Sequence, residues 1–171
     1  MRLEGEAWSR YFRDFEASAF RLELRQAYAM PDEEEDLRAF QEGQPPPPGY
    51  HYGWLDTVAE AKRQGKTIRR VRVVTRPLSF YTQWEFVWGF AWNAKAGEDI
   101  RILDVTDQAP PELADHDFWL FDNSTVVKLL YRPDGTQIGR ELVEQPDLTS
   151  YLGWRDAAWK QAIPFTDYYQ G

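Results

Sequence analysis

The sequence predicts an α/β fold, a single domain in which a mixed sheet of about six strands is flanked by helices. Segments whose apolar residues recur with a helical period alternate along the chain with segments of period two. The 171 residues suit one domain, and 43% apolar and 16% aromatic residues supply a core. The chain shows no internal repeat and no second composition regime, so one domain over residues 1–171 is the economical interpretation.

The chain begins with a predicted helix and then a predicted strand. Aromatic residues at i, i+3, i+4 and i+7 predict a helix over residues 5–16, within an N-terminal segment 1–17; they are Trp8, Tyr11, Phe12 and Phe15. The period then changes to two, because Phe20, Leu22 and Leu24 alternate with Arg21, Glu23 and Arg25. We expect a half-buried strand whose charged face is either solvated or forms the wall of a ligand site.

The middle of the chain continues the alternation of helices and strands. An acidic run begins at Asp32, which can cap a short helix reaching Phe40. The proline run predicts a stiff connector over residues 43–49, with a proline-rich ligand for a partner as the alternative. Apolar spacing and end signals predict a helix at 54–65, a strand at 68–75, a helix at 78–93 and a strand at 100–105.

The last part of the chain predicts strands and a closing helix. Residues 118–121 are almost wholly apolar and predict a central strand. The turn sequence Arg-Pro-Asp-Gly at 132–135 joins strands at 125–131 and 137–143 into a β-hairpin, because proline presets φ and glycine takes the unusual conformation. A final helix begins near Asp147 and ends before Pro164.

The charge distribution singles out one basic segment. Residues 61–76 hold seven Lys and Arg and no acidic residue, in a chain whose net charge is −8. The cations within 62–76 are the one candidate for nucleic-acid binding, but the acidic remainder of the chain argues against it. The alternatives are a basic patch that faces the chain's own acidic surface, or a site for an anionic small molecule or an acidic protein.

Three cations lie inside apolar strands and need partners if both faces of the sheet are covered. They are Arg72, Arg101 and Lys128. An unpaired buried charge is very costly, so each requires an acid or a ligand. The acids of suitable type are Asp99, Asp104, Asp122 and Glu85.

Several kinds of site are missing from the sequence. The chain has no Cys and 2 His, which excludes disulfides, thiolate chemistry and a multi-His metal site. Asp115, His116 and Asp117 are adjacent, but neighbouring strand residues point to opposite faces, so we expect His116 to be a turn or strand-entry residue. No phosphate-binding loop, dinucleotide fingerprint or nucleophile elbow occurs, and we expect no catalytic residue, metal or cofactor.

Neither a signal peptide nor a membrane span is expected. The first residues lack an apolar stretch, and no run of about 18 apolar residues occurs. We therefore expect a cytoplasmic protein that does not bind membranes.

Five segments together resemble an uncharacterised actinobacterial family, catalogued as a domain of unknown function. They are FRLE at 20–23, VRVV at 71–74, GEDIR at 97–101, HDFWLFD at 116–122 and WRDAAW at 154–159. The resemblance covers residues 15–165. It implies a regulatory or accessory role, because members are often encoded near helix-turn-helix regulators, and it brings no catalytic residues.

The order of elements from 19 to 162 is also similar to one half-domain of the phospholipase D superfamily. That family's catalytic signature is His-x-Lys followed by an Asp. Here His116 is followed at the second position by Phe118, and His51 by Gly53. The similarity therefore implies this fold without the catalysis.

The hypothesis that follows is a non-catalytic regulatory or accessory module that binds a small anionic or aromatic ligand or a partner protein, such as a helix-turn-helix regulator. The arginines would hold the anion and the aromatics an apolar body. The candidate ligand-binding residues are Arg72, Arg76, Tyr81, Trp84, Glu85, Arg101, Trp119 and Asp122. The alternatives are a biosynthetic small-molecule enzyme that uses Glu85, Asp99 or Asp122 as acid or base, and a nucleic-acid-associated regulator. The apolar helix at 78–93 also allows a homodimer.

Overall fold

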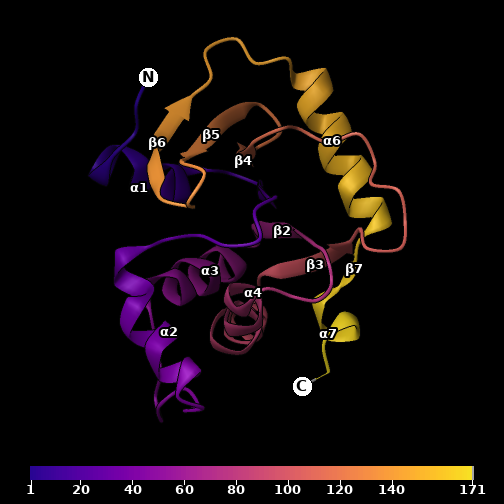
Figure 1. Cartoon of the computed structure of the whole chain (residues 1–171). Helices are drawn as coiled ribbons and strands as arrows, with labels where there is room; N and C mark the ends of the chain where they lie inside the picture. Colours follow the sequence, from indigo (N-terminus) through magenta and orange to yellow (C-terminus); the bar gives the residue numbers. More distant parts are fainter. Residues whose placement is uncertain (171) are drawn as a thin grey trace.

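The computed structural model describes residues 1–170 and contains a mixed sheet of seven strands in the order β6-β5-β4-β1-β2-β3-β7 (Figure 1). The parallel strands are β1 (Ser18–Glu23), β2 (Thr67–Val74) and β3 (Asp99–Asp104). The antiparallel strands are β4 (Asp117–Phe121), β5 (Thr125–Tyr131), β6 (Gln137–Leu142) and β7 (Ile163–Pro164). The predicted mixed sheet is confirmed. The strand that we did not predict is β7, whose two residues are too few to show a period.

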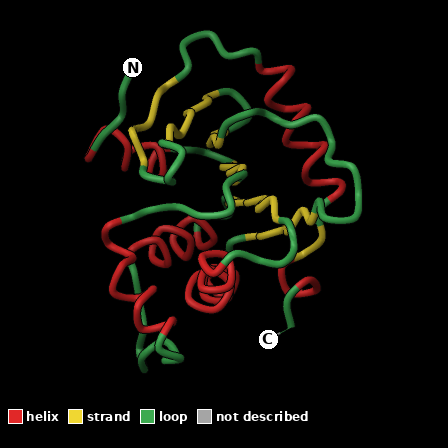
Figure 2. The backbone as a smooth tube through the Cα atoms, in the orientation of Figure 1, coloured by secondary structure: helices red, strands yellow, loops and turns green. Residues whose placement is uncertain are grey.

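Helices cover both faces of this sheet (Figure 2). One face packs against α6 (Leu148–Gln161). The other lies against a group of helices: α1 (Gly5–Asp14), the 3-10 turn η1 (Pro31–Glu33), α2 (Glu34–Gln41), α3 (Gly53–Arg63), α4 (Phe80–Glu85), the π-helix η2 (Phe86–Phe90) and α5 (Ala91–Ala96). A short α7 (Phe165–Tyr168) follows β7. The predicted helix at 78–93 is therefore a chain of three helical pieces, and no sequence signal marked the π-helix.

The two faces of the sheet differ in chemistry. The face under α6 is apolar, with Phe20, Leu22 and Phe118 among its buried residues. The opposite face is apolar beneath α1 and α3, but along β1 and β2 it carries arginines and carboxylates. Glu23 is 2% exposed and Arg72 is fully buried. Of the two alternatives for the charged face of the first strand, the solvated face is wrong, because the helices α2 to α5 cover it.

The hairpin between β5 and β6 fixes the loop that follows β1. The predicted turn forms at 132–135, and Gly135 has a φ of +91°. The amide N–H of Ala29 donates to the carbonyl oxygen of Gly135 over 3.0 Å. A Cβ atom on Gly135 would lie 2.9 Å from the carbonyl oxygen of Ala27. Glycine therefore allows the turn to approach the 24–29 loop closely.

None of the helices over residues 1–170 has both the length and the apolar composition needed to cross a bilayer.

Candidate functional site

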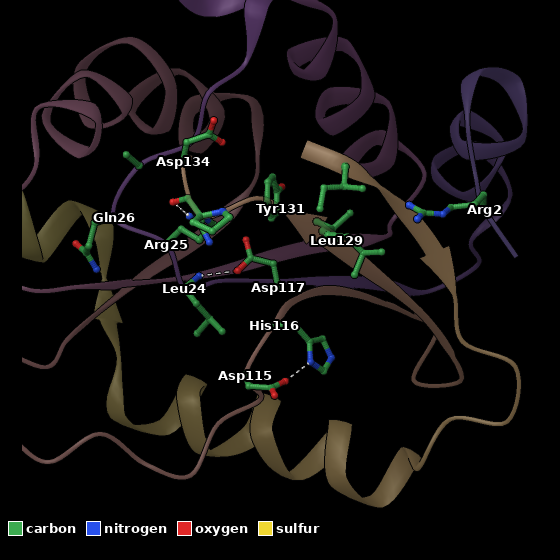
Figure 3. A pocket seen from close by; sticks show the side chains of 14 residues that line it. Arg2, Leu24, Arg25, Gln26, Asp115, His116, Asp117, Leu129, Tyr131 and Asp134 are labelled. Carbon is green, nitrogen blue, oxygen red and sulfur yellow. Dashed lines mark hydrogen bonds and ion pairs between the residues drawn. The ribbon is translucent and has the colours of Figure 1, made fainter. Parts of the chain in front are cut away.

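The parallel strands end at one edge of the sheet, where a large cavity opens (Figure 3). Since β4 runs antiparallel to β1, and β5 to β4, the start of β4 and the end of β5 reach the same edge. The cavity has a volume of about 830 Å³ and is lined mainly by residues 24–27, 115–117 and 129–134. Ligands of open α/β sheets commonly bind outside the carboxyl ends of the strands.

Arg25 is the central basic group of this cavity. Its Nη2 donates to the carbonyl oxygen of Pro133 over 2.7 Å, and its guanidinium lies 5.9 Å from the ring centre of Tyr131. Its buried Nε has no hydrogen-bond partner within residues 1–170. Arg2 stands at the far end of the cavity (Figure 3). Around these two cations the lining is largely apolar, with Leu24, Leu129, Leu130 and Ile138.

His116 forms a hydrogen-bonded chain on the cavity wall. Its Nδ1 lies 2.7 Å from Asp115 Oδ1, and its Nε2 lies 2.9 Å from the hydroxyl of Tyr151 on α6. Burial and the charge of Asp115 raise the pKa of Tyr151, so its hydroxyl stays protonated near neutral pH. His116 precedes β4, which confirms the expectation of a strand-entry residue.

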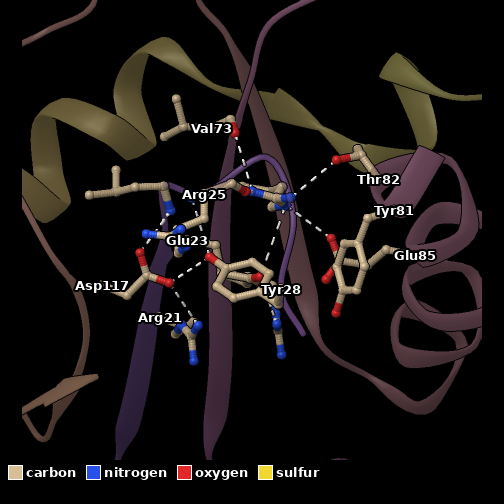
Figure 4. A network of polar contacts seen from close by, with 12 residues as sticks. Arg21, Glu23, Arg25, Tyr28, Val73, Tyr81, Thr82, Glu85 and Asp117 are labelled. Carbon is tan, nitrogen blue, oxygen red and sulfur yellow. Dashed lines mark hydrogen bonds and ion pairs between the residues drawn. The ribbon is translucent and has the colours of Figure 1, made fainter. Parts of the chain in front are cut away.

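A network of buried charges lies behind the cavity, on the covered face of the sheet (Figure 4). Asp117 accepts from Arg21 Nη2 at 3.0 Å, from the hydroxyl of Tyr28 at 2.5 Å and from the amide N–H of Leu24 at 3.0 Å. This network positions the start of the loop that carries Arg25. It also neutralises Asp117, because both oxygens of that carboxylate are engaged.

Arg72 occupies the centre of this network and pairs with Glu85, one of the four acids of suitable type that the sequence offered. Its Nε lies 2.9 Å from Glu85 Oε1 and 3.9 Å from Glu23 Oε2, and its Nη2 donates to Thr82 over 3.1 Å. Burial alone would raise the pKa of Glu23, but the charges of Arg70 and its neighbouring arginines lower it to about 2. Burial and the negative charge of Glu23 raise the pKa of Glu85.

The structure does not bring the eight predicted site residues together in one place. Trp84 and Glu85 line a second, smaller pocket, and Tyr81 donates to Glu33 at its margin over 2.8 Å. Arg72 lies in the buried network rather than in a cavity. None of the eight predicted residues lines the large cavity.

The other four predicted residues lie far apart on the sheet. Arg76 is exposed and pairs with Asp104 and Asp107. Arg101 lies 3.9 Å from the ring centre of Trp159 on the α6 face. Trp119 belongs to the core beneath α1 and α3. Asp122 lies at the opposite edge of the sheet, where it accepts hydrogen bonds from the amides of residues 16–18.

Sequence reasoning missed Arg25 as a candidate and set His116 aside. The one feature of the sequence that pointed to Arg25 is its position at the end of an alternating strand. The sequence predicted the hairpin but could not show that it lies beside Arg25, because Pro133 and Tyr131 are more than a hundred residues away along the chain.

The basic segment does not form a continuous surface. Arg70 and Arg72 pair with carboxylates inside the network, and Arg76 pairs with acids on β3 and in the loop after it. Lys66 lies 4.7 Å from the ring centre of Phe15, and Arg69 lies 5.2 Å from that of Trp159. The segment thus faces the chain's own acidic and aromatic side chains.

Comparisons with known proteins agree with this architecture. The fold resembles the crystal structure of a phospholipase D family member, Nuc from Salmonella typhimurium, with a TM-score of 0.50 and 14% sequence identity over 94% of this chain and 91% of that chain. At this identity the likeness shows the fold alone. No curated protein matches the chain. The model of a domain of unknown function, DUF6879, matches residues 6–170, and the chain therefore belongs to that family.

Proposed function

We propose that the protein is a non-catalytic binding module that takes a small anionic ligand with an apolar body into the cavity at the carboxyl edge of the sheet. The observation that carries this proposal is the guanidinium of Arg25. It lines the cavity, its Nε is buried without a partner, and its Nη2 meets a carbonyl oxygen rather than a carboxylate. A carboxylate or phosphate oxygen on a ligand in the cavity would accept a charge-assisted hydrogen bond from the guanidinium of Arg25.

No acid of the cavity wall forms an ion pair with Arg25 within the described chain; each contacts another group. Asp117 is held by Arg21 and Tyr28. Asp134 accepts the amide N–H of Thr136 over 2.9 Å, and Asp115 contacts His116. Arg2 and Arg25 both line the cavity, and neither forms an ion pair with a carboxylate of the described chain, so these two guanidinium groups would hold the anion.

The rest of the lining suits an apolar body attached to that anion. Leucine and isoleucine side chains face the cavity beside the ring of Tyr131. Its volume of about 830 Å³ falls within the range of small-molecule pockets.

One observation favours binding over phosphodiester hydrolysis. A solved structure with a similar fold is that of a phospholipase D family member, and here Phe118 stands two positions after His116, where that superfamily's signature has Lys. We therefore propose no phosphodiester hydrolysis.

Paired probes test the proposal directly. Isothermal titration calorimetry would compare benzoate with benzamide and phenyl phosphate with phenol, which share a body and differ in charge. We expect the anion of each pair to bind at least tenfold more tightly. Arg25→Met should lower that affinity about 10- to 100-fold, as expected for one charged hydrogen bond. Arg38→Met removes an exposed arginine outside the cavity and should leave the affinity unchanged.

Two results would overturn the proposal. If the neutral probes bind as well as the anions, or if Arg25→Met and Arg38→Met behave alike, the cavity is not an anion site. Release of inorganic phosphate from phenyl phosphate by the wild-type protein, absent in Arg25→Met, would instead establish an enzyme.

The remaining expectations stay predictions. They are the regulatory role, the helix-turn-helix partner, the actinobacterial source, the cytoplasmic location and the homodimer. We do not propose nucleic-acid binding through the basic segment, because its arginines are paired within the chain.

A further inference from the structure

A second pocket lies on the helical side of the charge network and has the opposite chemistry. It has a volume of about 240 Å³ and sits between η1 and α2, the 50–52 segment, and the helices α4, η2 and α5. Aromatic rings form much of its wall; they belong to Tyr50, Tyr52, Trp84, Trp88 and Phe90. Several of these rings also pack against one another; the ring centres of Tyr50 and Trp88, for example, are 5.2 Å apart. We call it the acidic aromatic pocket.

Three carboxyl groups of this pocket each have one oxygen engaged. The hydroxyl of Tyr81 donates to Glu33 Oε1 over 2.8 Å, and the hydroxyl of Tyr50 donates to Asp36 Oδ2 over 2.6 Å. Arg72 Nε pairs with Glu85 Oε1 over 2.9 Å. No side chain or amide of residues 1–170 donates to their second oxygens, which are left for a donor from outside the chain.

The arginines nearby do not neutralise these acids. Arg70 lines the pocket, but it already pairs with Glu23 and with Glu98, the latter over 2.9 Å. Arg72 is shared between Glu85 and Glu23. The pocket therefore holds more carboxyl groups than the surrounding cations can balance.

The protonation of the pocket reflects this shortage of positive charge. Burial and the charges of Asp32, Glu23 and Asp36 raise the pKa of Glu33 to about 7, against a hydrogen bond from Tyr81 that lowers it. Glu85 also has a raised pKa, because it is buried close to Glu23. A positive charge inside the pocket would lower both pKa values.

Gly89 lines the pocket beside Glu85. A Cβ atom there would make ordinary van der Waals contact with Glu85 Cγ, at 3.7 Å. Its carbonyl oxygen accepts from the hydroxyl of Tyr52 over 3.0 Å, which holds that ring at the wall. Gly89 belongs to the π-helix, a geometry that recurs at functional sites.

We propose that the acidic aromatic pocket binds a small alkylammonium ion. The faces of Trp and Tyr rings attract cations, and the open carboxylate oxygens of Glu33, Asp36 and Glu85 supply the counter-charge and accept N–H hydrogen bonds. The site is separate from the anion cavity and has its own ligand. Because different residues line the two sites, one proposal can fail without the other.

Binding of defined probes tests this proposal. Calorimetric titration with choline, n-butylammonium and 3,3-dimethyl-1-butanol, the uncharged carbon analogue of choline, separates charge from shape. At least one of the two cations should bind, tenfold or more tightly than the neutral alcohol. Choline carries a permanent charge, so any pH dependence of its binding belongs to the protein. If its affinity depends on ionised Glu33 alone, it should rise about tenfold from pH 6 to pH 8.

Matched variants locate the site. Glu33→Gln removes a pocket charge at nearly constant shape and should weaken cation binding about tenfold. Glu35→Gln removes the same charge from an exposed position on the same helical segment and should leave the affinity within twofold. Tyr50→Leu removes an aromatic face and should weaken binding about fivefold, whereas Tyr50→Phe keeps the ring and should retain most of the affinity.

The proposal fails if neither cation binds, if the neutral alcohol binds equally well, or if Glu33→Gln and Glu35→Gln behave alike. Thermal denaturation of each variant distinguishes lost binding from lost folding. Should Tyr50→Leu not fold, Glu33→Gln alone decides the question. Arg25→Met, which removes the anion-binding arginine, should bind the cation as the wild-type protein does.

Discussion

Removing the buried guanidinium of Arg72 offers a sharp test of the charge network. The side chain is fully buried and makes an ion pair with Glu85 and hydrogen bonds to Thr82 and to the carbonyl oxygen of Arg25. Its guanidinium also lies 5.4 Å from the ring centre of Tyr28. Methionine is the mildest replacement, because it keeps most of the length of the side chain and adds no polar group.

The expected loss follows from what Arg72→Met leaves behind. Glu85 and Glu23 remain buried with one fewer cation, and removing one partner of a buried ion pair costs about 3–5 kcal/mol. For a chain of this size each kcal/mol lowers the melting temperature by about 2–4 °C, so we expect a fall of roughly 6–20 °C. Arg76→Met should cost at most about 1 kcal/mol, because that guanidinium pairs with acids at the surface.

Urea unfolding followed by circular dichroism at pH 7 measures both variants. The double variant Arg72→Met/Glu85→Gln should be less destabilised than the sum of the two single variants, because it leaves one fewer carboxylate unpaired. The reasoning is refuted if Arg72→Met loses less than about 1 kcal/mol, or no more than Arg76→Met does.

Three further predictions concern other parts of the chain. The pKa of Glu33 is about 7 in the folded protein, above its ordinary value, so the stability it contributes is full below about pH 4.5 and is lost as the pH rises through 7. Glu33→Gln should therefore reduce the fall of the free energy of unfolding between pH 5 and pH 8. If urea unfolding gives the same pH dependence for the variant and the wild-type protein, the prediction is contradicted. Asp122→Ala removes the acceptor of three amide N–H groups at residues 16–18 and should lower the free energy of unfolding by about 1–3 kcal/mol. Asp122→Asn keeps an acceptor oxygen and should cost less. Equal losses in the two variants would show that these hydrogen bonds do not stabilise the fold. Gly135→Ala should lower the free energy of unfolding by about 1–3 kcal/mol, because the residue has a φ of +91° and a Cβ atom there would clash with the 27–29 loop. Gly43→Ala is the control, because Gly43 has a φ of +78° but open space around it. Thermal denaturation should show a smaller loss for Gly43→Ala than for Gly135→Ala.

Local patterns in the sequence predicted the elements well because each element carries its own signal. The period of two from Phe20 to Glu23 marked β1, and the Pro-Asp-Gly turn marked the β5–β6 hairpin. The π-helix and β7 escaped prediction, since one is a local departure from an apolar helical pattern and the other has two residues.

The candidate site was predicted less well, because it is built from contacts between distant segments. Sequence reasoning identified Arg72 as a charge in need of an acid, and Glu85 as one suitable partner, by the cost of burying a cation alone. It could not show that Glu23 and Arg21 are buried too, since an alternating charged strand has the same pattern on a wet face and under a layer of helices. It also could not pair Arg25 with Pro133, or Glu33 with Tyr81.

The sequence by itself determined the α/β class, the order of the main helices and strands and the need of Arg72, if buried, for a partner, because these depend on local period, turn chemistry and the cost of an unpaired cation. Only the tertiary structure decided which face of the sheet the helices cover, and it thereby created two separate pockets beside one ion-pair network, one lined by Arg25 and the other by Glu33, Asp36 and Glu85. The physical reason is that the sequence around a charged residue looks the same whether that residue lies on a solvated face or on a covered one. Its partners, and so the ligand charge it favours, depend on segments that meet only when the chain folds.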